Sequence, residues 1–295
     1  MAPKTFYIVD VFAEEKYAGN QLAVVRDAAD LSDEQMLRMT REMNYSETTF
    51  ILDDVSRDGG YDVRIFTPGA EVPFAGHPTL GTAYVIRQEL IKQPVETVNL
   101  NLKVGRIPVT FKETNEGGEI LWMKQIEPVF AQILEHESLS AVLEIDKKEI
   151  DDRFPIQEVS TGLFAMIVPL KNLDAVRRIK VNKDKYFELV QNTTAKVILV
   201  FCPETYHNQN DLHVRVFCDF YGVPEDPATG SANGCLAGYL LKHRYFGTGE
   251  IDVHVEQGYE IGRPSLIDLR AEENGDKIEV LVGGKVVMIA GGRLY

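Results

Sequence analysis

The sequence predicts an α+β fold of two pseudo-symmetric halves, in each of which a sheet wraps around one central helix. Three observations support this: a repeat at half the chain length, two uncharged helical windows, and more strand-like than helical segments. Repeated blocks at a fixed offset indicate repeated structural units. The expected boundaries place residues 1–115 with 280–295 in the first half and residues 116–279 in the second.

The repeat rests on three features in the same order. VRIF at 63–66 recurs as VRVF at 214–217, an offset of 214 − 63 = 151, and each copy then reaches Val-Pro and a glycine before a helix. Upstream, NYSETTFIL at 44–52 aligns with NTTAKVILV at 192–200, an offset of 192 − 44 = 148. Two unrelated strand–turn–helix units are the alternative, but the common order and nearly common offset favour a duplication.

The central helices are predicted from an absence of charge. Residues 72–86 and 227–241, fifteen in each window, contain no Asp, Glu, Lys or Arg, where about four would be expected from average composition. A helix without a charged face is normally buried on all sides. Its N-terminal N–H groups then offer an anion-binding site without a cationic side chain.

The remaining elements follow from period, composition and capping residues. Ser32 and Gln35 have the spacing of a capping box, and Met36, Met39 and Met43 continue a helix that ends near Asn44. The other helices are predicted at 78–89, 128–152, 183–191 and 231–245. The strands are predicted at 5–12, 48–52, 61–67, 96–102, 106–112, 119–124, 158–160, 163–169, 196–202 and 212–218, with several more after 245.

Composition and charge exclude several classes of protein. The 295 residues carry 31 Lys and Arg against 45 Asp and Glu, a net charge of −14, which disfavours nucleic acid and anionic membrane surfaces as partners. Three cysteines without a CxxC pair, and an N-terminus without a long apolar run, predict a cytoplasmic protein. The six histidines are scattered and no HExxH occurs, so no metal is expected, and the absence of GxxxxGK[ST] and GxGxxG leaves nucleotide binding without support.

The two copies differ in their polar residues. The alignment matches Glu47 with Ala195, and the second copy has three extra residues before its glycine, which add Asp226. The first copy therefore offers Glu47 and His77, and the second offers Asp226 and Ser231. A single carboxyl group suits a reaction that takes a proton from one carbon and returns it at another position.

Each of these residues also has a structural interpretation. Glu47 could be a solvated turn carboxylate, and Asp226 a turn residue before Pro227. His77 could cap its helix with Pro78 at the first helical position, and Ser231 could be an N-cap. The asymmetry between the copies favours site roles for Glu47 and Asp226.

Three motifs together resemble those of the phenazine-biosynthesis isomerase family, the PhzF-like proteins, which have the diaminopimelate epimerase-like fold. The motifs are SETTF, FTPxxEVPFAGHPTLG and EDPATGSANG, and the similarity covers nearly the whole chain. The resemblance implies two β-barrel or roll halves, an active site between them, a C-terminal strand that returns to the first half, and a homodimer.

Carried over to this sequence, the resemblance implies that Glu47 is the general acid/base. His77, Asp226 and Ser231 then line the pocket, and Gly76 and Gly230 supply backbone N–H groups. Asn20 is a weaker candidate for the pocket rim. The cysteine pair of related racemases is replaced by Ala75 and Thr229, which argues against a thiol-pair racemase.

The resulting hypothesis is a cofactor-independent isomerase that moves a proton on a small carboxylate-bearing metabolite held between two helix N-termini. One alternative is a serine-type hydrolase using Ser231, His77 and Asp226, although Gly230-Ser231-Ala232 is not a GxSxG elbow. The other is a non-catalytic protein that binds a small anion.

Overall fold

The computed structural model describes residues 2–114 and 117–295, and the chain divides into two compact units. The first unit comprises Met1–Met123 and Gly283–Tyr295, and the second comprises Lys124–Val282. Strands β8 (Glu119–Lys124) and β17 (Lys277–Gly284) pass the unit boundary. The expected boundary at 115/116 lies eight residues before the first observed boundary (123 − 115). The expected boundary at 279/280 lies three residues before the second (282 − 279).

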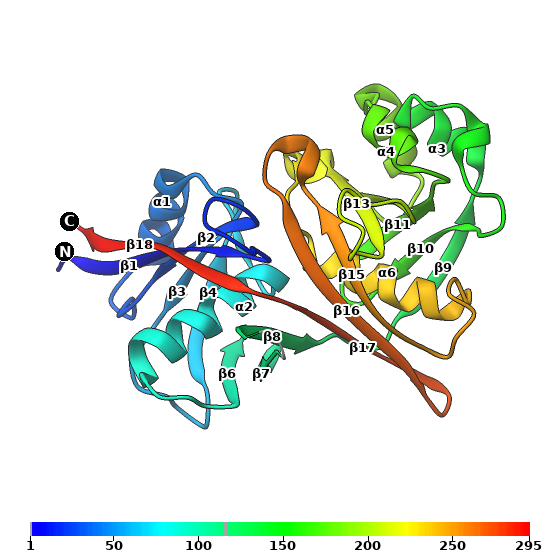
Figure 1. The fold of residues 1–295 in the computed structure, drawn as a ribbon. Coiled ribbons are helices and arrows are strands. Elements are labelled where there is room, and N and C mark those ends of the chain that lie inside the picture. The colour runs from blue at the N-terminus through cyan, green and yellow to red at the C-terminus, as the bar shows by residue number, and fades with distance from the viewer. Residues whose placement is uncertain (1, 115–116) are drawn as a thin grey trace. The chain divides into compact units, whose positions relative to one another are not determined.

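The first unit is a sheet with one central helix and one outer helix (Figure 1). Its outer helix is α1 (Asp33–Met43), which starts at the predicted Ser32–Gln35 capping box. Its central helix is α2 (Gly76–Val85), which continues into the π-helical turn η1 (Ile86–Ile91). The strands besides β8 are β1 (Lys4–Val11), β2 (Asn20–Val25), β3 (Thr48–Ile51), β4 (Tyr61–Phe66), β5 (Glu71–Val72), β6 (Thr97–Leu102), β7 (Gly105–Glu113) and β18 (Val286–Leu294).

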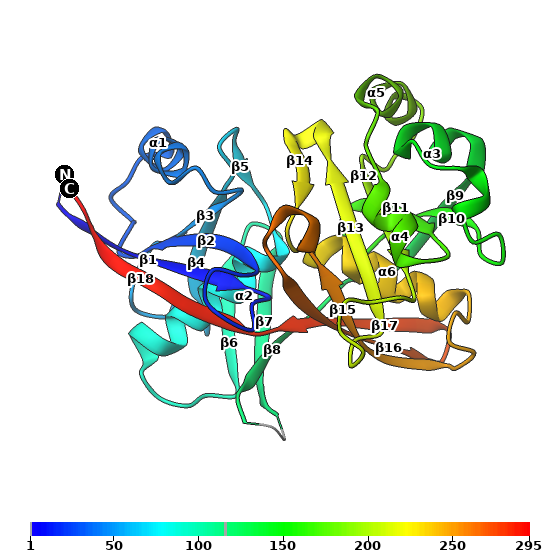
Figure 2. The same ribbon diagram turned by 45° about the horizontal axis from the view of Figure 1, so that its top comes forward.

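The second unit repeats this plan around its own helix, α6 (Gly230–Lys242) (Figure 2). Its outer helices are α3 (His136–Leu143), α4 (Leu173–Arg178) and α5 (Lys183–Gln191), with short 3-10 turns η2 (Lys147–Glu149), η3 (Asp219–Tyr221) and η4 (Tyr259–Ile261). Its strands besides β17 are β9 (Val129–Leu134), β10 (Ile156–Ser160), β11 (Phe164–Pro169), β12 (Val197–Cys202), β13 (Leu212–Cys218), β14 (Val223–Asp226), β15 (Glu250–Gln257) and β16 (Ser265–Asn274).

The two units share the same ladder of strand pairs. In the first, the order is β18-β1-β2-β3-β4-β6-β7, with β2/β3 and β4/β6 parallel and the other pairs antiparallel. In the second, the order is β9-β10-β11-β12-β13-β15-β16, with β11/β12 and β13/β15 parallel. Each unit also has a short antiparallel strand, β5 on β4 in the first unit and β14 on β13 in the second. The predicted pseudo-symmetric fold is therefore confirmed.

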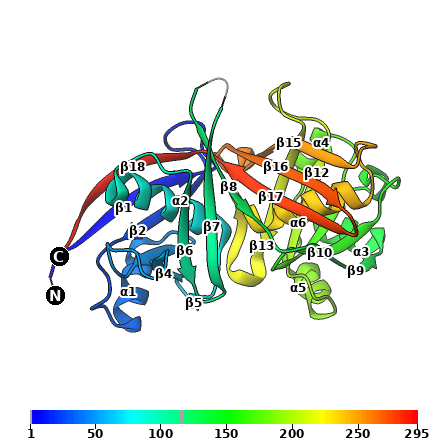
Figure 3. The same ribbon diagram turned by 90° about the horizontal axis from the view of Figure 1, so that it is seen from below.

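The central helices are enclosed, as their lack of charge predicts. Helix α2 packs on β1, β2, β3, β6, β7 and β18, and α6 packs on β10, β11, β12, β15 and β16. Every residue of α2 except Tyr84 is buried, as is every residue of α6 except Ser231 and Lys242. Strand β18 closes the first unit by pairing with β1, which brings the two chain ends together at the Lys4–Leu294 pair (Figure 3).

The predicted helix at 128–152 is wrong in its first part. Residues 129–134 form strand β9 on β10, and the helix α3 that follows is only eight residues long. The strand VFAQIL contains β-branched and aromatic residues, and its pairing with β10 outweighs the helical tendency of the charged segment after it. Strand β2 was also not predicted, although its apolar residues are buried between β1 and β3.

The close packing of α2 depends on a glycine in its middle. A Cβ atom at Gly81 would lie 2.6 Å from Leu22 Cδ2 and 2.8 Å from Val11 Cγ2, both on strands that enclose the helix. Overpacking of this kind costs about 1–3 kcal/mol, more than the ~1 kcal/mol that alanine gains over glycine in a helix.

We therefore expect Gly81→Ala to lower the free energy of unfolding by about 1–2 kcal/mol in denaturant titrations. The matched control is Gly69→Ala, because a Cβ there would meet only Thr67 Oγ1, at 3.7 Å. A Gly81→Ala protein as stable as the Gly69→Ala protein would contradict the close approach of the helix to its sheet.

Candidate active site

Helix α2 begins after an N-cap residue whose side chain makes no capping hydrogen bond. Its N-cap is Ala75 in an extended conformation, and the Thr79 hydroxyl donates back to the Ala75 carbonyl at 2.8 Å. The first helical residues are Gly76, His77 and Pro78, so Pro78 is third and His77 second. The structural alternative for His77, a cap with Pro78 at the first helical position, is therefore wrong.

Strand β3 brings Glu47 to this helix end. The hydroxyls of Thr49 on β3 and Thr82 on α2 are 2.7 Å apart and fully buried. Glu47 precedes Thr49 by two residues, about 7 Å along an extended chain, and His77 precedes Thr82 by five, about 7.5 Å along the helix. The strand and helix thus run side by side from Thr49 and Thr82 to Glu47 and His77.

Glu47 and His77 meet in a largely buried environment. His77 Nε2 lies 3.5 Å from Glu47 Oε2, and the two side chains are 8% and 19% exposed. The Oε2 atom itself is buried and has no hydrogen-bond partner among the described residues. Removal from water raises the pKa of the Glu47 carboxyl above its ordinary value of 4.5, and the neighbouring Ser46 side chain partly opposes this rise.

This arrangement can hold and release a proton. A carboxyl group with a raised pKa keeps its proton at a higher pH than a solvated one and is a stronger base once it has lost it. The N-terminal end of α2 beside it carries a partial positive charge that favours an anionic ligand group. Among the described residues there is no cluster of three or more His, Cys, Asp and Glu that could hold a metal ion.

Asn20 belongs to the same edge of the first unit's sheet. It is the first residue of β2, is 3% exposed, and follows Gly19, whose φ of 66° is left-handed. Because β2 and β3 are parallel, with Ala23 beside Thr48, both strands begin at the edge where Glu47 lies.

The second unit has a corresponding helix end with different residues. Helix α6 begins at Gly230, with Thr229 as N-cap, and Ser231 is its half-buried second residue rather than the predicted N-cap. The carbonyl of Ser231 accepts a 3.4 Å hydrogen bond from the Thr161 hydroxyl. Asp226 ends strand β14, and its Oδ2 atom accepts a hydrogen bond from the Thr229 hydroxyl.

The strand register changes which residue matches Glu47. In the first unit, Ile65 on β4 pairs with Thr49 on β3. In the second unit, Val216, which repeats Ile65, pairs with Leu199 on β12. Residues of β3 therefore correspond to residues of β12 at an offset of 199 − 49 = 150. The residue matching Glu47 is then Val197, and the alignment with Ala195 was shifted by two residues. Val197 is also apolar and buried, so the asymmetry between the units remains.

Sequence reasoning missed two residues that hold the α6 end together. Asn233 and Gln257 are both fully buried, and they bond to each other and to Thr229. Asn233 lies inside the EDPATGSANG motif, which could have drawn attention to it. Gln257 lies 28 residues after Thr229 (257 − 229), outside any motif.

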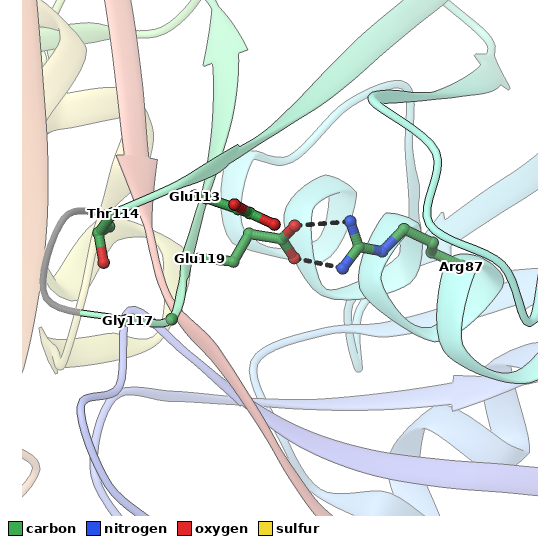
Figure 4. Close-up of a pocket in the computed structure, with 6 residues that line it drawn as sticks. Arg87, Glu113, Thr114, Gly117 and Glu119 are labelled. Carbon is green, nitrogen blue, oxygen red and sulfur yellow. Dashed lines mark hydrogen bonds and ion pairs between the residues drawn. The ribbon is translucent and has the colours of Figure 1, made fainter.

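A separate hollow in the first unit contains none of the predicted site residues (Figure 4). The guanidinium of Arg87 forms a two-point ion pair with Glu119 there, with one N–O distance of 2.7 Å. The lining residues are Arg87, Glu113, Thr114, Gly117, Gly118 and Glu119. Within the hollow, the positive charge of Arg87 is therefore already paired with a carboxylate.

Known structures share the fold of the whole chain. A PhzF-family phenazine biosynthesis protein from Bacillus anthracis covers 100% of both chains, with a TM-score of 0.92 at 28% identity. A hydroxyproline epimerase from Agrobacterium vitis covers 100% of this chain and 91% of its own, with a TM-score of 0.65 at 9% identity, which shows the fold alone. The chain therefore has the diaminopimelate epimerase-like fold.

A sequence relative adds the class of enzyme. The trans-2,3-dihydro-3-hydroxyanthranilate isomerase of Pseudomonas aeruginosa is 35% identical over 291 residues, covering 98% of this chain and 99% of the relative. The fold and this likeness define the protein as an enzyme of the isomerase class. The model of the phenazine biosynthesis-like protein family, PhzC-PhzF, matches residues 9–292, and the chain belongs to that family.

No helix within the described parts of the chain is long and apolar enough to cross a membrane.

The raised pKa of Glu47 predicts how stability depends on pH. Burying the ionised carboxylate costs folding free energy, and this cost is absent below the unfolded pKa, where the group is protonated in both states. The cost grows as the pH rises from about 4.5 through the folded pKa. We therefore expect Glu47→Gln to have a higher free energy of unfolding than wild type at pH 7.5, and the gain to vanish toward pH 4.5, in denaturant titrations followed by Trp122 fluorescence.

Glu71→Gln is the control of opposite sign. Hydrogen bonds from Arg64 at 2.7 and 2.8 Å hold the pKa of Glu71 below its usual range, so its ionised form stabilises the fold at neutral pH. Its removal should lower stability at pH 7.5 and matter less in acid. A Glu47→Gln protein that is less stable at pH 7.5, or equally changed at both pH values, contradicts the buried position of the carboxyl.

Proposed function

We propose that this enzyme is a cofactor-independent isomerase that moves a proton between two carbons of a small carboxylate-bearing metabolite, with Glu47 as general base and then general acid. The observation that supports it most is the buried Oε2 of Glu47 beside His77 at the N-terminus of α2. The matching position of the second unit, Val197, has no acid or base. At this matched position only the first unit has a group that can transfer a proton.

The proposed reaction has a simple balance of atoms and electrons. The Glu47 carboxylate removes a proton from a substrate carbon, the electrons of the C–H bond shift an adjacent double bond, and the protonated carboxyl delivers the proton to a second carbon. Product and substrate have the same composition, so the step requires no oxidant and no reductant. General acid–base catalysis of this kind contributes roughly 10²–10⁴-fold in rate.

The other predicted site residues have supporting roles in the proposal. His77, which lies beside Glu47, would hydrogen-bond the substrate, while the N–H group of Gly76 would bind a substrate carboxylate at the positive end of α2. In the second unit, Gly230 and Ser231 would bind substrate in the same manner at the start of α6, and Asp226 would bind an amino or hydroxyl group. Asn20 would contact substrate at the start of β2.

A dihydroaromatic amino acid is the first candidate substrate. The compound in the name of the Pseudomonas aeruginosa relative, trans-2,3-dihydro-3-hydroxyanthranilate, carries a carboxylate, an amino group, a hydroxyl group and a ring with mobile double bonds. In the proposal, the helix N-termini would bind the carboxylate, Asp226 would bind the amino or hydroxyl group, and Glu47 would move the proton. Other cyclic carboxylates with an acidic C–H bond satisfy the same chemistry.

The test is incubation in deuterium oxide with this compound and with a panel of small cyclic carboxylates. We expect solvent deuterium to appear at carbon with wild type, and Glu47→Gln to lower the rate by roughly 10²–10⁴-fold. Glu42→Gln, which changes an exposed carboxyl on α1, is the matched control and should exchange at the wild-type rate.

Two other outcomes would replace the proposal. The first is turnover that persists in Glu47→Gln but is abolished by a serine-directed phosphonate, which would indicate the hydrolase. Such an enzyme requires a His paired with an Asp. In this structure His77 lies beside Glu47 instead, and Asp226 is bonded to Thr229. Tight stoichiometric binding of a panel member without deuterium uptake would indicate a binding protein.

A further inference from the structure

Gln257 uses its whole hydrogen-bonding capacity on the segment around Asp226. It ends strand β15 and is fully buried. Its Oε1 atom accepts from the Thr229 N–H at 3.2 Å and from Asn233 Nδ2 at 2.9 Å. Its Nε2 atom donates to the Asp226 carbonyl at 2.7 Å and to Thr229 Oγ1 at 3.0 Å. Two donated and two accepted bonds fill an amide side chain and fix its orientation.

These bonds set the direction of the Thr229 hydroxyl. Its oxygen accepts the N–H of Gln257, so its own proton is directed to the other partner, Oδ2 of Asp226. A hydrogen bond donated to a carboxylate oxygen holds the group in place. Gln257 thereby acts on the Asp226 side chain through Thr229, and on the Asp226 backbone directly.

The backbone on both sides of this segment is also held closely. Gly258 has a φ of 80°, and a Cβ there would lie 2.6 Å from the Pro227 carbonyl oxygen, so only glycine lets β15 approach so near. That same carbonyl accepts a 2.9 Å hydrogen bond from the buried Ser265 hydroxyl. The position of Asp226 is therefore determined by contacts from β15 and β16 as well as by its own strand.

The first unit has apolar residues at the matching positions. In the first unit, Asp62 on β4 pairs with Asn101 on β6. In the second unit, His213 on β13 repeats Asp62 at the offset of 213 − 62 = 151, and it pairs with Glu256 on β15. Asn101 therefore corresponds to Glu256. One residue further along, Leu102 in the first unit matches Gln257 in the second. The N-cap positions likewise contain Ala75 and Thr229. A glutamine is thus not needed for this strand to pack beside its central helix.

We propose that Gln257 is a positioning residue that orients the Thr229 hydroxyl and, through it, the Asp226 carboxylate for substrate binding and turnover. The proposal rests on the function proposed above, in which Asp226 contacts substrate. It adds an outer residue to the site, from a strand that no sequence motif marks.

The first test is structural and needs no substrate. Gln257→Leu introduces the residue of the first unit, and Gln257→Glu keeps an oxygen that can accept from Thr229 N–H and Asn233 Nδ2 but loses both N–H donors. In crystals of either variant we expect the hydrogen bond between Thr229 Oγ1 and Asp226 Oδ2 to be lost. In the glutamate variant the Thr229 hydroxyl turns to donate to the new carboxylate. In the leucine variant the hydroxyl loses the hydrogen bond from residue 257 that orients it. Gln257→Glu, the smaller change, covers the case in which the leucine variant does not fold.

Gln157→Leu is the matched control, because this glutamine lies at the other end of α6. It bonds the Ala131 carbonyl at 3.0 Å and His243 Nε2 at 2.8 Å, close to the last turn of the helix. The bond between Thr229 and Asp226 should persist in this variant. Retention of that bond in both Gln257 variants would overturn the proposal.

The second test measures kcat and KM separately, on a compound for which wild type shows deuterium uptake. We expect Gln257→Glu to lower kcat/KM by about 10- to 100-fold, the range that misplacement of a site group by about 1 Å can produce. In the Asp226→Asn background the same substitution should add less than about twofold, since residues that act through one another are not additive. Gln157→Leu should retain wild-type values of both constants.

The outcomes separate the two proposals. If Asp226→Asn leaves kcat and KM unchanged, the role given to Asp226 in the proposed function fails, while the crystal structures still decide whether Gln257 positions it. If Asp226→Asn is impaired but Gln257→Glu matches wild type, or its effect is equally large in both backgrounds, the role of Gln257 fails and the proposed function remains.

Discussion

Each unit depends on the enclosure, by a sheet, of one helix without a charged face. Because α2 and α6 have no charged face, they are stable only when strands cover them along their length, which requires the sheet to curl around them. Small residues such as Gly81 let the strands approach. The side faces of each helix are occupied by the sheet, so its chemistry is concentrated at the first turn, where N–H groups lack partners within the helix.

The duplication makes the chemical differences between the units informative. The strand ladders are the same, so a difference at a matched position is not required by the fold. Three of these differences set a polar side chain in one unit against an apolar one in the other: Glu47 against Val197, Thr229 against Ala75, and Gln257 against Leu102. The first places a buried carboxyl in one unit, and the other two build the hydrogen bonds around Asp226 in the other unit.

The sequence was most informative where local patterns and repetition act together. The VRIF and VRVF blocks, the uncharged windows and the Ser32 capping box correctly located β4, β13, both central helices and the start of α1. Glu47, His77, Asp226 and Ser231 were selected because they lie in short motifs beside these elements. The structure brings Glu47 and His77 together within 3.5 Å.

Other features depend on tertiary contacts that a sequence does not display. Strand β9 takes its conformation from its pairing with β10, and the helix starts moved by one or two residues because Ala75 and Thr229 occupy the caps. The two-residue shift that matches Glu47 with Val197 follows from the cross-strand register, which a linear alignment across a loop of different length does not fix. Gln257 reaches Asp226 only because parallel pairing places the end of β15 beside β13.

The central claim is that the Glu47 carboxyl is kept out of water in the folded chain and is thereby prepared for proton transfer. The most direct measurement is a ¹³C NMR titration of glutamate side-chain carboxyl carbons, with the Glu47→Gln protein used to assign the resonance. We predict that the Glu47 signal titrates with a pKa above the ordinary value of 4.5. A Glu47 resonance that titrates at or below that value would contradict the account.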